Sequence, residues 1–286
     1  MAWLQMDFAS ESLKRLVSAN VIIPADMRLG PQPSMDKPFK TLYLLHGYSG
    51  DWTDWLTGTT LMEMAQLNNI AVVMPSGENS FYVDIEHSGR LYSTFIARDL
   101  VNFTRKIFPL STKREDTIIG GLSMGGYGAL YNGLKHSDVF GHVIALSSAL
   151  VVESAVTSTD EPNMMGTNRG YFADIFGDLD KVMESDRNLD VLAKQVMDKG
   201  GDLPDLYIAC GYNDMLVYGN RKLSKHLNEI GYKHVYEEGA GTHDWVFWNN
   251  FLKRGLDRLD LAPKGDAMVP PFWVDASKDS PNPVEV

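Results

Sequence analysis

Ser123 lies at the centre of a Gly-x-Ser-x-Gly pattern that begins at Gly121 and ends at Gly125. A short β-branched apolar run precedes the pattern at 117–119, and a helix-compatible run follows it. This context can hold a serine on a sharp turn from strand to helix, in a strained backbone conformation that presents its hydroxyl as a nucleophile. Side chains at the two flanking positions would collide in such a turn, so glycine is physically required at both. The pattern is a weak signal by itself, and its weight depends on partners elsewhere in the chain.

A serine hydroxyl is a poor nucleophile at neutral pH and needs a general base within hydrogen-bond reach. Of the seven histidines, His243 is the candidate, because it stands in a glycine-rich segment between the last predicted strand and the last predicted helix. In an open α/β sheet, ligand-contacting loops gather at the carboxyl ends of the strands. The alternative is a helix-capping loop with an incidental histidine. The presence of Ser123 upstream favours the catalytic interpretation.

The third residue of such a cluster should be a carboxylate that orients the imidazole and stabilises its charged form. Asp214 follows the strand predicted at 206–210, and a helix and a strand separate it from His243, so both can lie at the same sheet edge. Asp205 precedes that strand and should lie at the opposite edge, and the side chain of Asp244 should diverge from the adjacent ring. Asp214 is therefore the expected acid, although a carboxylate in a turn is commonly just a turn former. The chain order serine, aspartate, histidine matches α/β-hydrolases and differs from that of serine proteases.

The negative charge that develops on a substrate oxygen needs two backbone donors, an oxyanion hole. One should be the amide of Met124, directly after the nucleophile and at a helix N-terminus whose dipole favours negative charge. The other should come from the loop after the strand at 41–45, where the amide of Tyr48 is the candidate; the alternative is a simple glycine-permitted turn. Trp52 and Trp55 follow this loop, either as walls of an acyl or alcohol pocket or as packing residues, and the sequence favours neither.

The elements that must position these residues alternate between strands and helices. Wholly apolar strands in such an alternation predict an α/β fold with a mostly parallel sheet and helices on both faces. The first two strands should form an antiparallel hairpin at a sheet edge. We predict strands at 2–8, 13–23, 41–45, 70–74, just before Ser123, at 142–147, 206–210 and 233–238, and helices at 59–68, 91–108, from Ser123 to about 135, at 217–230 and at 245–259.

The chain has 286 residues, of which 44% are hydrophobic and 22% charged, and this suits one sizeable α/β domain at 1–262. Residues 148–203 break the alternation and predict an insertion over the sheet, a small lid or cap. The tail at 263–286 is rich in Pro and Asp and has no periodicity. We expect it to lie extended on the surface or against a neighbouring subunit, which leaves a homo-oligomer open.

The overall charge argues against several kinds of partner. A net charge of -11 and a pI near 5.0 disfavour nucleic acid and mildly favour neutral substrates over strongly anionic ones. No run approaches the roughly 18 apolar residues of a membrane helix, and the first residues do not resemble a signal peptide. Cys210 is the only cysteine, which excludes an intrachain disulfide. We therefore expect a cytoplasmic protein without membrane association.

Four segments together resemble the esterase D-like "putative esterase" family of α/β-hydrolases, and among these the bacterial tributyrin (acetyl) esterases. They are 45–50 (LHGYSG) with Trp55, 121–128 (GLSMGGYG), 209–214 (ACGYND) and 240–245 (AGTHDW), within a likeness that covers roughly 1–262. The resemblance implies an α/β-hydrolase fold and a serine carboxylesterase that hydrolyses short-chain acyl (acetyl or butyryl) or aryl esters through an acyl-enzyme. It also implies that neither a metal nor a cofactor takes part.

The same resemblance leaves the substrate open. Relatives include feruloyl and acetylxylan esterases, S-formylglutathione hydrolases and mycolyltransferases, so thioester hydrolysis and acyl transfer are alternatives. A non-catalytic binding protein on the same fold is a further alternative. Such a protein would normally have lost one of the three residues Ser123, Asp214 and His243, and none is missing.

Overall fold

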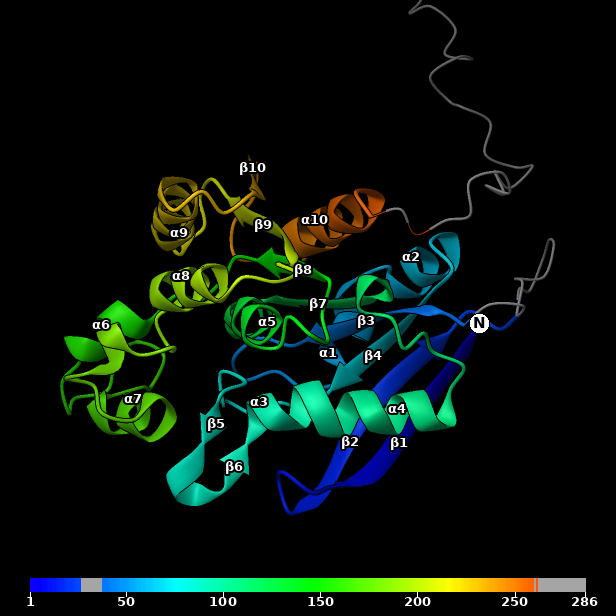
Figure 1. Cartoon of the computed structure of the whole chain (residues 1–286), viewed down its shortest axis with the longest axis horizontal. Coiled ribbons are helices and arrows are strands. Elements are labelled where there is room, and N and C mark those ends of the chain that lie inside the picture. Colours follow the sequence, from blue (N-terminus) through cyan, green and yellow to red (C-terminus); the bar gives the residue numbers. More distant parts are fainter. Residues whose placement is uncertain (27–37, 260, 262–286) are drawn as a thin grey trace, which may run out of the picture.

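The computed structural model describes residues 1–26, 38–259 and 261, and Figure 1 shows the course of the chain. Within these residues an eight-stranded sheet has the order β1-β2-β4-β3-β7-β8-β9-β10. Its strands are β1 (Ala2–Ser10), β2 (Arg15–Ile23), β3 (Lys40–Leu45), β4 (Ile70–Pro75), β7 (Thr117–Leu122), β8 (His142–Leu146), β9 (Asp205–Gly211) and β10 (His234–Gly239). A separate short pair is formed by β5 (Asp84–Ile85) and β6 (Arg90–Leu91).

The sheet is mostly parallel. Neighbouring strands run parallel from β4 through β3, β7, β8 and β9 to β10, whereas β2 runs antiparallel to both β1 and β4. This confirms the predicted α/β fold and the antiparallel hairpin at one edge. In a parallel sheet the strands all end at the same edge, so the loops after β3, β7, β9 and β10 come together there.

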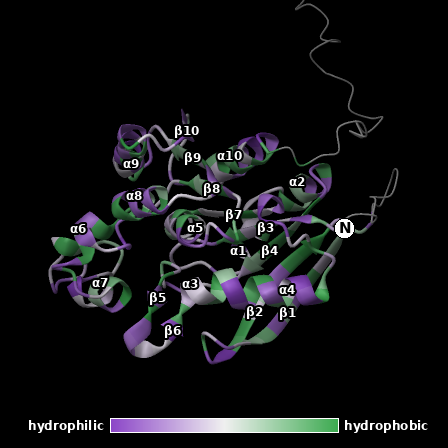
Figure 2. Ribbon diagram, in the orientation of Figure 1, coloured by the Kyte–Doolittle hydropathy of each residue, from purple (hydrophilic) through white to green (hydrophobic). Residues whose placement is uncertain are grey.

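Helices cover both faces of the sheet, and a buried apolar cluster lies on each face. One face carries α1 (Asp54–Gly58), α2 (Leu61–Leu67) and α10 (Trp245–Asp257). The other carries α3 (Tyr92–Thr94), the π-helical η2 (Phe95–Leu100), α4 (Val101–Ile107), α5 (Met124–Lys135), α8 (Leu189–Lys199) and α9 (Val217–Glu229). Short 3₁₀ turns are η1 (Glu86–Ser88), η3 (Arg114–Asp116) and η4 (Val182–Glu184). Figure 2 shows the predominantly hydrophobic central strands beside helices that also carry hydrophilic residues.

The helix predicted at 91–108 is divided by a π-helical segment, which apolar spacing alone does not reveal. Asp99 lies in this segment, and its carboxylate accepts hydrogen bonds from the Ser10 hydroxyl (2.6 Å) and the Ser12 amide (2.8 Å). The helix is thereby tied to the turn between β1 and β2.

The segment predicted as an insertion contains two helices at one side of the molecule, α6 (Val152–Val156) and α7 (Arg169–Phe176), followed by η4 and α8. Helix α7 packs through Phe176, whose ring centroid lies 5.2 Å from that of Phe81 and 5.9 Å from that of Tyr127. Helix α8 packs beside α5 and α9. Aromatic packing therefore fixes α7 to the helix that follows Ser123.

In the part of the chain that the structure describes, none of the helices is long and apolar enough to cross a membrane. The tail predicted to be extended, 263–286, lies outside the described residues.

Candidate active site

Ser123 occupies a strained turn between β7 and α5, with φ 54° and ψ -117°. A Cβ atom on Gly121 would lie 2.3 Å from the carbonyl oxygen of Gly125, and one on Gly125 would lie 2.5 Å from that of Leu45. Real Cβ atoms essentially never approach backbone so closely. The predicted need for glycine at both flanking positions is thus confirmed, and it has a steric cause.

Three side chains far apart in the sequence meet at this turn. The Nε2 atom of His243 lies 3.1 Å from Ser123 Oγ, and its Nδ1 atom lies 2.9 Å from Asp214 Oδ2. Asp214 lies in the loop after β9, and His243 lies in the loop after the neighbouring β10. Because these two strands are parallel, both residues lie at the same edge of the sheet. The carboxylate is fully buried, while the imidazole side chain is 23% exposed. The arrangement has the connectivity of a nucleophile, a base and an orienting acid.

The Asp214 carboxylate is held in its ionised form. Burial alone raises its pKa, but hydrogen bonds from His243, the Leu216 amide (2.8 Å) and the Ser147 hydroxyl together hold the pKa below its usual value. An ionised acceptor facing Nδ1 fixes the neutral imidazole with its proton on that atom. The Nε2 lone pair is then directed to the Ser123 hydroxyl.

Two further residues support this cluster, and the sequence reasoning did not identify them. The Trp248 indole Nε1 donates a 3.1 Å hydrogen bond to Ser147 Oγ. The Trp248 ring also meets the His243 ring edge-on, with centroids 4.9 Å apart and an interplanar angle of 88°. Ser147 is fully buried at the end of β8, next to the strand that carries the acid. The available signal was its position at a strand's carboxyl end, beside the predicted site.

The two rejected carboxylates are engaged elsewhere. Asp205 begins β9 at the opposite edge, where its side chain is 83% exposed and lies 3.1 Å from His142 Nδ1. Asp244 is the N-cap of α10 and accepts a 2.9 Å hydrogen bond from the Phe247 amide. Both observations agree with the choice of Asp214 as the partner of the histidine.

The loop that carries Tyr48 passes directly beside Ser123. A Cβ atom on Gly47 would lie 2.7 Å from Leu122 Cδ1 and 3.6 Å from Ser123 Cβ. Met124 is the first residue of α5, on the other side of Ser123. The loop therefore passes close to Ser123, which α5 directly follows, and the two amide-donor roles stay predictions.

His46 fixes the start of this loop. Its Nε2 atom accepts a 2.8 Å hydrogen bond from the Gly77 amide, so Nδ1 carries the proton and donates to the Gly47 carbonyl at 2.8 Å. Burial lowers the pKa of this imidazole. With both nitrogens of its neutral ring hydrogen-bonded to this loop and to Gly77, His46 has a structural role, and His243 is the histidine that contacts Ser123.

The two tryptophans after the loop have different surroundings. Trp55 is 1% exposed, and its Nε1 donates a 2.9 Å hydrogen bond to the Leu45 carbonyl within the core on the α2–α10 face. This favours packing over a pocket wall for Trp55. Trp52 is half-buried, and its carbonyl accepts a 2.8 Å hydrogen bond from Asn20 Nδ2. Its place in a pocket stays a prediction.

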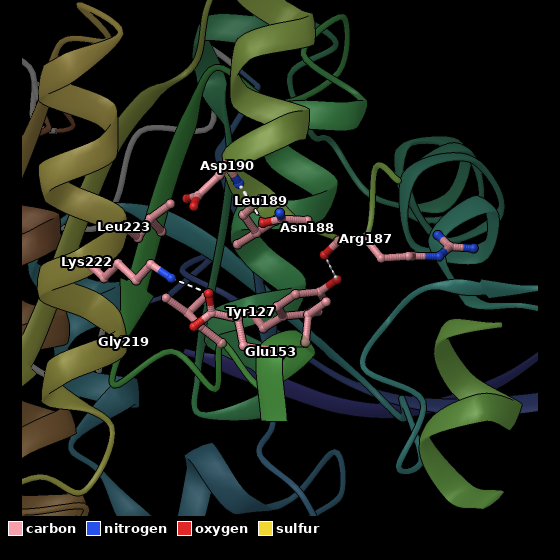
Figure 3. Close-up of a pocket in the computed structure, with 11 residues that line it drawn as sticks. Tyr127, Glu153, Arg187, Asn188, Leu189, Asp190, Gly219, Lys222 and Leu223 are labelled. Atoms are coloured by element: carbon pink, nitrogen blue, oxygen red, sulfur yellow. Dashed lines mark hydrogen bonds and ion pairs between the residues drawn. The ribbon is translucent and has the colours of Figure 1, made fainter. Parts of the chain in front are cut away.

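A small cavity of about 50 Å³ lies between α5, α6, α8 and α9 (Figure 3). Figure 3 shows the ion pair of Lys222 with Glu153 at this cavity, and the Arg187 guanidinium directed away from it. Tyr127, one turn after Ser123 in α5, contributes to its wall. None of the predicted site residues lines it, so it adjoins α5 without containing the hydrogen-bonded cluster.

Cys210, the single cysteine of the sequence, is fully buried. Burial raises the pKa of the Cys210 thiol to about 12, which keeps it protonated and unreactive. Among the described residues, no group of three or more histidine, cysteine, aspartate or glutamate side chains is arranged to hold a metal ion.

Comparison with known proteins agrees with this geometry. Residues 10–259 match the family described as "Putative esterase". The chain is 41% identical over 262 residues to an acetyl esterase of Caldicellulosiruptor saccharolyticus, covering 90% of this chain and 97% of that one. Two Staphylococcus aureus structures, the fluorophosphonate-binding serine hydrolase FphF and the S-formylglutathione hydrolase FrmB, superpose with TM-scores of 0.79 and 0.77. Each is 29% identical to this chain and aligns over 90% of it and 97% of its own length.

Proposed function

This chain belongs to the Putative esterase family, and we propose that it is a serine carboxylesterase that hydrolyses short-chain acyl esters, of the acetyl to butyryl kind, through an acyl-enzyme on Ser123. One observation carries the proposal: the imidazole of His243 is hydrogen-bonded at once to the Ser123 hydroxyl and to the buried carboxylate of Asp214. Similarity to an acetyl esterase supports the short acyl group. The net charge of -11 favours a neutral substrate.

Acylation begins when Ser123 Oγ attacks the ester carbonyl and His243 Nε2 accepts the hydroxyl proton. The imidazolium that forms is stabilised by the ionised Asp214. The carbonyl oxygen becomes an oxyanion, which the amides of Tyr48 and Met124 stabilise. When the tetrahedral intermediate collapses, His243 donates its proton to the leaving alcohol, and the acyl group stays on Ser123.

Deacylation repeats these steps with water. His243, neutral again, removes a proton from a water molecule that attacks the acyl carbonyl. The same two amides hold the second oxyanion. His243 then returns the proton to Ser123 Oγ, and the carboxylic acid departs.

The direct test is turnover of p-nitrophenyl acetate and butyrate by the wild type and by Ser123→Ala. We expect the substitution to lower kcat by at least roughly 10³-fold, because no nucleophile is left. A fluorophosphonate probe should label the wild type and not the variant. Equal rates in the two proteins would end the proposal.

The proposed oxyanion donor can be tested separately. Tyr48→Pro removes the amide hydrogen, whereas Tyr48→Ala keeps it and removes only the ring. Loss of one such donor typically lowers kcat by about 10²–10³-fold. We expect that loss for the proline variant alone; a comparable loss in the alanine variant would assign the effect to the ring.

A second candidate function is thioester hydrolysis, favoured by the similarity to an S-formylglutathione hydrolase. The same nucleophile, base and acid would serve, and only the leaving group would differ. Comparing kcat/KM for S-formylglutathione with that for acetyl, butyryl, feruloyl and acetyl-sugar esters separates the two. A clear preference for the thioester would replace the short-chain ester as substrate.

A further inference from the structure

A tyrosine outside the hydrogen-bonded cluster is connected to the loop that carries Tyr48. The hydroxyl of Tyr171, in α7, donates a 2.7 Å hydrogen bond to the carbonyl oxygen of Asn79. The side-chain oxygen of Asn79 in turn accepts a 2.7 Å hydrogen bond from the amide of Ser49. Ser49 directly follows Tyr48, so two hydrogen bonds link α7 to the loop beside the nucleophile.

The same tyrosine also touches the loop directly. The rings of Tyr171 and Tyr48 meet edge-on, with centroids 6.0 Å apart and an interplanar angle of 90°. Ser49 has a φ of +62°, in the left-handed region that a non-glycine residue adopts only when its surroundings hold it there. The contacts from α7 and Asn79 supply part of that constraint.

Helix α7 is itself a fixed support. Asp174 forms an ion pair with Arg90 and a hydrogen bond with His87 Nε2 (3.0 Å), both on the hairpin formed by β5 and β6. On the buried side of the helix, Phe176 packs against Phe81. Tyr171 therefore lies on a helix that an ion pair, a hydrogen bond and aromatic packing hold in place.

We propose that Tyr171 is a positioning residue for the oxyanion hole: acting through Asn79, it holds the Tyr48–Ser49 peptide and thereby the backbone of Tyr48, whose own amide in the preceding peptide then faces the developing oxyanion. Oxyanion donors are effective because they are fixed before the reaction, so a support outside the site can govern the rate. Segment 148–203 thereby stabilises the transition state through α7. The inference rests on the proposed esterase function.

The test is Tyr171→Phe, which removes the hydrogen bond to Asn79 and keeps the ring against Tyr48. The matched control is Tyr232→Phe, which likewise deletes a tyrosine hydroxyl bonded to a backbone carbonyl, that of Pro204 at 2.8 Å, just before β9 begins at the opposite edge of the sheet. Rates on p-nitrophenyl acetate are divided by the number of sites titrated with a fluorophosphonate, so only folded, reactive enzyme is counted. Thermal unfolding of both variants is recorded alongside.

We expect kcat of Tyr171→Phe to fall roughly 3- to 15-fold, the effect of losing one hydrogen bond, with KM unchanged. Inhibition by phenylboronic acid, which forms a tetrahedral adduct with the serine, should weaken by the same factor. A support that merely stabilised the fold would lower the unfolding temperature without this matched change. Because Asn79→Ala interrupts the same connection, the double variant should lose little more than the larger single loss.

Two outcomes overturn the inference and differ from failure of the proposed function. In the first, the wild type is active, but Tyr171→Phe keeps the wild-type kcat and boronate affinity or changes only in KM. This result removes the positioning role and leaves the esterase function intact. An equal loss of kcat in Tyr232→Phe assigns the effect to general destabilisation. A wild type that neither hydrolyses esters nor reacts with the fluorophosphonate removes both proposals.

Discussion

Gly211 and Gly241 hold two backbone loops in direct contact: a Cβ atom on Gly211 would lie 2.5 Å from the carbonyl oxygen of Gly241. The amide of Asn213 donates a 3.1 Å hydrogen bond to that same carbonyl. Asp214 follows the first glycine and His243 follows the second. The close approach of the two loops therefore sets the spacing between the carboxylate and the imidazole.

Gly211→Ala should separate these loops, because the new methyl group would overlap backbone that has no flexible end to yield. A displacement of about 1 Å at a catalytic group can cost up to about 10²-fold in rate, so we expect kcat/KM for p-nitrophenyl acetate to fall by up to that factor. Gly219→Ala is the control, since its Cβ would lie 3.6 Å from Leu150 Cβ, an ordinary contact. Unchanged kinetics in Gly211→Ala would contradict the steric argument.

Asp214→Asn should lower kcat severely, by roughly 10³–10⁴-fold, because an amide no longer fixes the imidazole tautomer or stabilises its charge. Asp205→Asn and Asp244→Asn should leave kcat close to that of the wild type. Asp205 lies at the opposite sheet edge, and asparagine at position 244 can still cap α10. Steady-state kinetics of the three variants checks this ranking, and a reversed order would move the acid to another residue.

Ser147→Ala should slow the reaction, because the Ser147 hydroxyl hydrogen-bonds the Asp214 carboxylate and accepts from Trp248. A hydrogen bond to a charged group contributes about 1.5–3 kcal/mol, which corresponds to a loss of roughly 10- to 100-fold in kcat/KM. The neighbouring Ser148 provides the control, since its buried hydroxyl has no hydrogen-bond partner among the described residues. Ser148→Ala should therefore keep full activity. Similar losses in both variants would refute the assignment.

His136 should make the fold sensitive to acid. Burial, and then the charges of Arg98 and Lys135, lower its pKa from 6.5 to about 4. Between those values the unfolded chain binds the proton that the folded chain excludes, so stability falls as the pH is lowered through this window. The contribution is at most about 1.4 kcal/mol per pH unit. The free energy of unfolding, measured with urea at pH 7 and pH 5, should change less with pH in His136→Gln than in the wild type. An equal change in the two proteins would disprove this prediction.

The sequence predicted the layout of the fold because alternation and apolar patterning are local properties. Every predicted strand has a counterpart within a few residues, as with 206–210 and β9 (Asp205–Gly211). The helix at 91–108 was only partly predicted, because a short π-helical stretch within an α-helix is rare and the apolar positions do not single it out. Whether Trp55 is a packing residue or a pocket wall also needed the structure, because its burial depends on which face of its helix packs on the sheet.

The sequence by itself determined the identity of the three clustered residues. Local patterns predicted them, because the ends of strands and the need for glycine in a tight turn both depend on neighbouring residues. These patterns are glycine at 121 and 125, and the positions of 214 and 243 after apolar runs. Only the tertiary structure decided which groups support them. Trp248 meets Ser147 across 101 residues, and Tyr171 meets Asn79 across 92. Such contacts depend on how separate helices pack over one sheet, and that packing leaves no local pattern in the chain.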